Sequence, residues 1–230
     1  MRRTEIALVT GANKGIGFEV ARQLAAKGFH VFVGARNEKA GRDAADRIGQ
    51  AATFVKLDVS NSRCVREAAV YVAKSADHLD VLVNNAGIIV DGDDAVLEIT
   101  TEQFETTART NAIEPLLVTQ AFQPMLARSA APRIINVSSS GGQLVDGADG
   151  WAPAYCISKT TLNAVTVQLA AALPKFAVNS VCPGWVRTEM GGPGATSSIE
   201  EGAAGIVWLA TDAPHKLTGK FIKRRKVIAW

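Results

Sequence analysis

A doubly wound parallel α/β sheet, with helices on both of its faces, is the fold class that this sequence predicts. First, short apolar runs alternate with longer helix-like stretches along the chain. Second, the strand-like runs lack polar alternation, which is typical of strands buried on both faces. Third, no internal repeat or linker divides residues 1–230, so we expect a single domain.

The predicted strands and helices follow one another in a regular order. Six segments have the apolar composition of buried strands: EIALVT (5–10), VFVGA (31–35), ATFVKLDV (52–59), LDVLVNNAG (79–87), RIINVSS (133–139) and AVNSVCPG (177–184). Helix-like segments lie at about 16–27, 38–48, 62–76, 101–128, 155–173 and 197–210. The last of these begins with Ser198 and Glu201 in the spacing of a capping box. This alternation favours parallel strands joined by helical crossovers.

Composition and charge argue against several classes of function. The formal net charge of +3 is too small to predict a nucleic-acid partner. Basic residues do gather near the end of the sequence, and we expect them to form a solvated strand or loop rather than a phosphate-binding patch. They are Lys220, Lys223, Arg224, Arg225 and Lys226.

Cysteine and histidine usage predicts a cytoplasmic protein without a metal. Cys64, Cys156 and Cys182 are far apart, form no Cys-x-x-Cys motif, and are expected to be reduced thiols. The three histidines have no metal-ligand spacing. The apolar run near the start, residues 6–9, is too short for a signal peptide or a membrane span, so no membrane partner is expected.

The turn TGANKGIG (10–17) joins the first predicted strand to the first helix. Its glycines Gly11, Gly15 and Gly17 let the backbone approach a pyrophosphate at the helix N-terminus, where free N–H groups favour anions. A tight strand–helix turn without a ligand would look similar. The position after the first strand favours a dinucleotide site of the Rossmann type.

The end of the second predicted strand indicates which dinucleotide is bound. NAD-binding proteins place an acid there, whereas an arginine accommodates the 2′-phosphate of NADP. Here Ala35 takes the position of the acid, Arg36 follows, and Lys14 in the glycine turn adds a second cation. The sequence therefore predicts NADP(H). Glu38 is the nearby acid that could contact the ribose if the cofactor were NADH.

Polar residues follow three further predicted strands. Asp58 and Val59 either contact an adenine or form the turn that leads into the next helix. NNAG (84–87) suits a backbone close to a ligand, although a plain turn would read the same. Ser138–Ser140 lie at the sheet edge that faces the ligand crevice. No G-x-S-x-G motif accompanies them, so a serine hydrolase is disfavoured.

YCISK (155–159) places Tyr155 four residues before Lys159 in a helical stretch. On a helix these two residues lie on one face, one turn apart. A free phenol has a pKa near 10, and an adjacent ammonium together with a cationic nicotinamide should lower it. The phenol and the ammonium would then point the same way, and Cys156 is interpreted as a small helix residue.

Over nearly its whole length, the chain resembles the short-chain dehydrogenase/reductase family. The resemblance rests on the order and spacing of TGANKGIG, NNAG, Asn111, VSSS, YCISK and PGWVRT (183–188). The resemblance implies that Tyr155 is the catalytic acid/base, that Lys159 is its partner, and that Ser139 orients the substrate oxygen. Ser138 and Ser140 are less favoured alternatives to Ser139. Asn111 completes the implied tetrad by holding a water linked to Lys159.

The resemblance also implies a set of cofactor contacts. The expected cofactor-binding residues are Gly11, Asn13, Lys14, Gly15, Ile16, Gly17, Arg36, Asp58, Val59, Asn85, Ala86, Gly87, Tyr155, Lys159, Pro183, Gly184, Val186 and Thr188. Residues expected to line the mouth of the substrate pocket are Gln143, Leu144, Val145, Trp151, Trp185 and Met190. The latter suggest an apolar ketone, unless Trp151 and Trp185 are core aromatics.

The chain resembles the carbonyl-reductase branch of the family at four places: PGWVRTEMGG (183–192), the ending GKFIKRRKVIAW (219–230), GANKGIG and GARN. This implies reduction of ketones, aldehydes and quinones with NADPH. Because the segment between Ser139 and Tyr155 is short, the flanking helices are expected to pair in a homo-oligomer. A 3-oxoacyl-thioester reductase is a lower-ranked alternative. A cofactor-sensing regulatory protein is another, but it would be expected to lack Tyr155 or Lys159.

Overall fold

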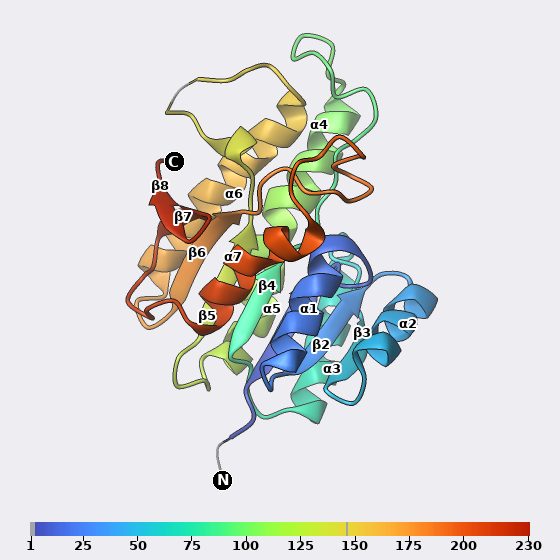
Figure 1. Ribbon diagram of the computed structural model, residues 1–230, viewed down its shortest axis with the longest axis vertical. Coiled ribbons are helices and arrows are strands. Elements are labelled where there is room, and N and C mark those ends of the chain that lie inside the picture. Colours follow the sequence, from blue (N-terminus) through green and yellow to red (C-terminus); the bar gives the residue numbers. More distant parts are fainter. Residues whose placement is uncertain (1–2, 146) are drawn as a thin grey trace.

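A computed structural model describes residues 3–145 and 147–230, and its core is one eight-stranded sheet (Figure 1). The strand order is β3-β2-β1-β4-β5-β6-β7-β8, with β8 antiparallel and all other neighbours parallel. The strands are β1 (Ile6–Thr10), β2 (His30–Ala35), β3 (Ala52–Lys56), β4 (Val81–Asn84), β5 (Arg133–Val137), β6 (Ala177–Cys182), β7 (Lys220–Lys223) and β8 (Lys226–Ile228). The doubly wound fold class is confirmed.

Helices cover both faces of the sheet, as expected. They are α1 (Gly15–Ala26), α2 (Glu38–Ile48), α3 (Ser62–Ser75), α4 (Thr101–Ala108), α5 (Glu114–Leu126), α6 (Pro153–Ala172) and α7 (Ile199–Thr211). One apolar cluster joins α1, α2 and α7 to one face, and a second joins α3, α5 and α6 to the other. Successive strand residues alternate between the two clusters: Leu8 belongs to one and Val9 to the other.

The structure refines the predicted elements at two places. The helix expected over 101–128 is interrupted by a π-helical turn, Arg109–Ile113, between α4 and α5. The basic residues near the end form the β7–β8 hairpin, with Arg224 and Arg225 at φ of 50° and 62° in its turn. These two side chains are exposed, in agreement with the solvated strand that we expected. The predicted capping box of Ser198 and Glu201 is present at the start of α7.

The topology places a crevice at the carboxyl edge of the sheet. The chain leaves β1 toward β2 and β3, then crosses back to add β4 on the other side of β1. In open α/β sheets this reversal of strand order marks the ligand-binding edge. The segments that follow β4, β5 and β6 all extend from this edge, opposite the N-terminus (Figure 1).

Candidate active site

The glycine-rich first turn packs against the segment that follows β4. Gly11 and Gly15 have φ of 63° and 57°, in the left-handed region that glycine adopts without strain. A methyl carbon added at Gly17 would lie 2.4 Å from Nδ2 of Asn85, which donates a 3.0 Å hydrogen bond to the Thr10 carbonyl. Asn13, Lys14 and Ile16 lie in the same turn. The turn therefore packs closely on Asn85, and no side chain caps the first N–H groups of α1, where a pyrophosphate would bind.

Three cations, which we call the cation cluster, follow neighbouring strands at this edge: Lys14 after β1, Arg36 after β2 and Lys56 at the end of β3. All three side chains are exposed. The Lys56 ammonium donates to the Arg36 carbonyl at 2.5 Å. Lys14 pairs with Glu189, which follows β6. Sequence reasoning missed Lys56, although its place at a strand end gave the same signal as Arg36.

The acidic residues near the cation cluster have other partners. The Glu38 carboxylate accepts from Arg42 one helical turn on, at 2.8 Å. The Asp58 carboxylate accepts from the backbone N–H and the hydroxyl of Ser60, at 3.1 and 2.7 Å, in the turn that leads into α3. Asp58 thus takes the helix-leading arrangement that was the alternative to an adenine contact. Val59 is half-buried beside it.

Tyr155 and Lys159 share one face of α6, as their spacing predicted. Both are buried, and Nζ of Lys159 lies 5.4 Å from the centre of the Tyr155 ring. The same ammonium donates to the Val137 carbonyl at the end of β5, 2.9 Å away. A methyl carbon at Gly87 would lie 3.5 Å from this Nζ and 3.1 Å from Oδ1 of Asn111. The glycine therefore lets the segment after β4 approach both groups.

Burial decides the pKa values of this pair. It raises the pKa of Tyr155 to about 12, and the nearby Ser139 hydroxyl opposes this rise only in part. Burial lowers the pKa of Lys159 to about 8. Without a cofactor, loss of hydration thus leaves the phenol pKa above its ordinary value, and its lowering by Lys159 together with a cationic nicotinamide stays a prediction. Burial also raises the pKa of Cys156 to about 11, which leaves an unreactive thiol.

The serine run after β5 contains one side chain that faces Tyr155. The Ser138 hydroxyl is buried and donates to the Lys159 carbonyl at 3.4 Å, toward the backbone of α6. Ser140 is exposed at the start of a short 3₁₀ turn, Ser140–Gly142. The Ser139 hydroxyl accepts from the Gly141 N–H at 3.1 Å and perturbs the Tyr155 phenol. The geometry favours Ser139 over its two neighbours.

Asn111 lies in the π-helical turn and is fully buried. Its Oδ1 accepts the Ile88 N–H and its Nδ2 donates to the Ile88 carbonyl, both at 2.8 Å. Nδ2 also donates to the Ser158 hydroxyl at 3.0 Å. Asn111 thus joins α6 to the segment after β4. π-Helical turns frequently occur at functional sites, and sequence periodicity gave no sign of this one.

The segment after β6 lies against the glycine turn. Pro183 and Gly184 follow the strand directly, and Gly184 has a φ of 87°. Val186 is buried against α7, and a methyl carbon at Gly15 would lie 3.5 Å from the methyl group of Thr188. Ala86 lies close to the turn from the other side, where a methyl carbon at Gly11 would approach its Cα at 3.0 Å. The segments after β4 and β6 therefore both lie against the glycine turn.

The residues predicted to contact substrate are mostly exposed. Trp151 and Trp185 are 54% and 56% exposed, so neither is a core aromatic. The rings of Trp151 and Tyr155 pack edge to face, with their centres 5.6 Å apart. Leu144, Val145 and Met190 are also exposed. The Gln143 amide instead donates to the Ala229 carbonyl at 2.9 Å and so faces the C-terminal segment.

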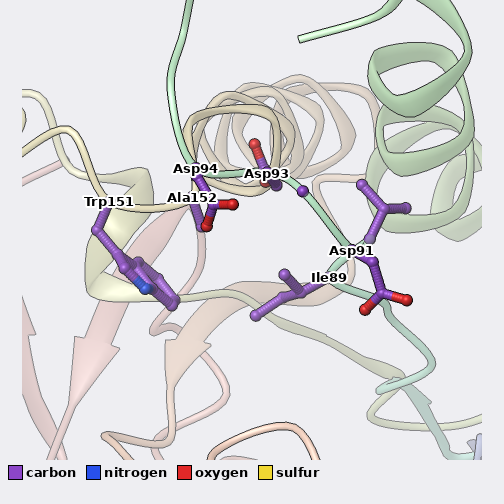
Figure 2. Close-up of a pocket in the computed structure, with 8 residues that line it drawn as sticks. Ile89, Asp91, Asp93, Asp94, Trp151 and Ala152 are labelled. Atoms are coloured by element: carbon purple, nitrogen blue, oxygen red, sulfur yellow. The ribbon is translucent and has the colours of Figure 1, made fainter. Parts of the chain in front are cut away.

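A hollow of about 290 Å³ lies beside Trp151 (Figure 2). Residues 89–94, which follow β4, line it on one side, and Trp151 and Ala152 line it on the other. Asp91 and Asp94 are exposed there, whereas Asp93 is buried. Asp93 accepts the N–H groups of Ala154 and Tyr155 at 2.8 and 2.9 Å. Sequence reasoning missed Asp93, because a loop acid far from α6 carries no local signal.

Two kinds of function receive no support from the described part of the chain. Within residues 3–145 and 147–230, no group of three or more His, Cys, Asp or Glu side chains could hold a metal ion. None of the described helices is both long enough and apolar enough to cross a membrane.

Comparison with known proteins agrees with this geometry. Residues 5–197 match the family described as short chain dehydrogenase. A (+)-neomenthol dehydrogenase of Arabidopsis thaliana is 35% identical over 286 residues, covering 96% of each chain. Carbonyl reductase (NADPH) 1 of Mus musculus is 33% identical over 279 residues, covering 98% of each. Both alignments are longer than this chain, so these relatives carry insertions that it lacks.

Solved structures are similar over the full length. An NADPH-bound carbonyl reductase from chicken fatty liver has a TM-score of 0.90 at 29% identity, covering 100% of both chains. The carbonyl reductase Sniffer of D. melanogaster has a TM-score of 0.91 at 26% identity, with the same coverage. The likeness therefore includes the strands that position the site.

Proposed function

Because the chain belongs to the short-chain dehydrogenase family, we propose that it reduces ketones or aldehydes to alcohols with NADPH. The observation that carries this proposal is the pairing of Tyr155 with Lys159, 5.4 Å from ring centre to Nζ, at the sheet edge that also holds the glycine turn. Its relatives include carbonyl reductases whose names specify NADPH.

The residues of the crevice fit a dinucleotide with a 2′-phosphate. The glycine turn leaves the N–H groups at the start of α1 accessible to a pyrophosphate. Ala35 presents no carboxylate at the end of β2, while the cation cluster of Lys14, Arg36 and Lys56 presents positive charge. NADPH, when bound, supplies the hydride that reduces the carbonyl carbon.

The protein's own groups then complete the reduction. Tyr155 donates its proton to the forming alkoxide, and Ser139 donates a hydrogen bond to the same oxygen. With a pKa of about 12, the phenol is protonated at neutral pH, as an acid must be. The Lys159 pKa of about 8 keeps the ammonium charged at neutral pH, where it favours the phenolate left behind. Asn111 holds the backbone beside this pair.

The test is consumption of NADPH, followed by its absorbance, with a panel of ketones, aldehydes, quinones and acyl thioesters. Turnover with simple ketones or aldehydes supports the proposal. Turnover restricted to acyl thioesters would instead support a 3-oxoacyl-thioester reductase. NADPH binding without turnover of any of these compounds would contradict the proposal and favour a cofactor-sensing protein.

The protein is further proposed to be a cytoplasmic homo-oligomer. Apolar side chains on α4, the π-helical turn and α6 are exposed and could be covered by a second copy: Phe104, Ile113, Ile157 and Val167. The three cysteines are unpaired, which suits a reducing compartment. Light scattering that shows only particles of one chain's mass, 24.3 kDa, would contradict the oligomer.

A further inference from the structure

The helix that carries Tyr155 begins without a cap of its own. α6 starts at Pro153, which has no N–H, and the preceding residue, Ala152, provides no side-chain hydrogen bond. Ala152 also has a φ of 39°, in the left-handed region that is unfavourable for a residue with a Cβ. The first N–H groups of the helix, on Ala154 and Tyr155, therefore need an acceptor from elsewhere.

Asp93 supplies that acceptor from a position 61 residues earlier in the chain than Ala154. Oδ1 accepts the Ala154 N–H at 2.8 Å, and Oδ2 accepts the Tyr155 N–H at 2.9 Å. The carboxylate is 5% exposed, so water competes little for these bonds. Its negative charge also lies at the positive end of the α6 dipole. Figure 2 shows Asp93 beside the helix, across the hollow from Trp151.

Hydrogen bonds hold the backbone of Tyr155 on two sides. On one side, Asp93 holds the Tyr155 N–H. On the other, the Ser158 hydroxyl donates to the Tyr155 carbonyl at 2.6 Å and accepts from Asn111. The Asn111 side chain also hydrogen-bonds both the N–H and the carbonyl of Ile88, which lies five residues before Asp93 in the chain. The backbone of Tyr155 is therefore held at both its N–H and its carbonyl.

From these contacts we propose that Asp93 is a positioning residue for the reduction proposed above, on which this inference rests. It fixes the start of α6 and so holds the Tyr155 phenol where the forming alkoxide appears. Asp93 touches neither the crevice of the glycine turn nor the cation cluster. Its effect should therefore fall on kcat and leave NADPH binding unchanged, because a displaced acid slows proton transfer without altering the cofactor site.

The test compares Asp93→Asn with Asp46→Asn, the same change at an exposed residue of α2 that lies outside the site. Asparagine offers one acceptor oxygen where the carboxylate offers two, so one N–H of α6 loses its partner. Asp93→Asn should lower kcat for a simple ketone by about 10- to 100-fold. The dissociation constant of NADPH, followed by fluorescence, should stay at the wild-type value. Asp46→Asn should match the wild type in both measurements.

Three results would overturn the inference. One is a kcat of Asp93→Asn equal to that of Asp46→Asn. The second is a loss of NADPH affinity as large as the loss of kcat, which would indicate a general structural role. The third is a wild type without carbonyl turnover, which would overturn the proposed function as well. If Asp93→Asn does not fold, Asp93→Glu keeps the charge and both oxygens but displaces them, and should again lower kcat alone.

Discussion

The two halves of the crevice are built in different ways. On the side of α6, which we call the catalytic wall, Asn111, Tyr155 and Lys159 are 0%, 8% and 4% exposed. Backbone groups hold the side chains of Asn111 and Lys159, and the Asp93 carboxylate holds the backbone N–H of Tyr155. On the side of β2 and β3, the cation cluster is exposed. The difference follows from the two tasks. Proton transfer requires a fixed position and a shifted pKa, whereas a phosphate can be attracted by charge alone.

This comparison implies that substitutions on the two sides differ in size and in salt dependence. A change in the catalytic wall removes a group that nothing else can replace, and burial shields it from salt. A change in the cation cluster removes one of several screened charges. The following predictions test that contrast, from the largest expected effect to the smallest.

The largest effect is expected for Tyr155→Phe in the catalytic wall. The ring and its contact with Trp151 remain, and only the proton donor is lost. We expect kcat to fall by about 100- to 10,000-fold, with NADPH affinity and the thermal midpoint close to wild type. The loss should be the same at low and high salt. A variant that keeps more than about a tenth of wild-type turnover would show that another group is the acid.

Burial of Lys159 in the catalytic wall should make the free energy of unfolding depend on pH. Burial lowers the pKa of Lys159 from its ordinary value of 10.5 to about 8. Between these two pH values the unfolded chain therefore binds more protons than the folded one. Stability from this group is therefore present at high pH and is lost as pH falls through 8. Compared with Lys159→Met, the wild type should gain on the order of 3 kcal/mol of unfolding free energy over that range.

Denaturant unfolding of both proteins at several pH values provides the measurement. Tyr155 is present in both proteins, and its raised pKa, which weakens the fold above pH 10, cancels in the comparison. Lys175→Met, at an exposed site, is the control. The difference in unfolding free energy between the wild type and this variant should not change with pH. A difference between wild type and Lys159→Met that does not change with pH would contradict the buried, destabilised ammonium.

Sequence reasoning was informative where a residue type and its position along the chain sufficed. Strand-end glycines, the Tyr155–Lys159 spacing and the capping box of α7 are local patterns, and the structure shows the geometry that they predict. The strand order could also be inferred, because buried strands joined by helical crossovers permit few topologies. The assigned roles of the site residues stay predictions that the experiments above must test.

Contacts between distant segments were not predictable in the same way. Asp93 caps a helix 61 residues away, and the π-helical turn at Asn111 lies inside a stretch that reads as one continuous helix. The Gln143 amide faces Ala229, at the other end of the sequence. The pKa of Tyr155 depends on how deeply α6 is buried, and a four-residue spacing carries no information about burial. Each of these follows from packing, which a single sequence does not display.

In the cation cluster, Arg36→Ala should have a moderate effect that salt reduces. Arg36 can hydrogen-bond the 2′-phosphate through its planar fork. Its loss should lower kcat/KM with NADPH by about 10- to 150-fold at low ionic strength, and less at high salt. NADH lacks the phosphate and should change little. Arg63→Ala, an exposed arginine paired with Glu67 on α3, is the matched control. Equal losses with both cofactors would indicate a structural role for Arg36.

The smallest effect is expected at Lys14, because this lysine already has a partner. Lys14 and Glu189 are 61% and 78% exposed, so a phosphate must compete with Glu189 for a screened ammonium. Lys14→Ala should weaken NADPH by only about 1.5- to 5-fold. Glu189→Gln should act in the opposite direction and tighten NADPH by a similar factor, since it frees Lys14 and removes a negative charge near the phosphate. Titration of both variants at low and high salt tests this. If Glu189→Gln weakened NADPH, the pair would instead order the segment after β6, and this side of the crevice would depend on fixed contacts as the catalytic wall does.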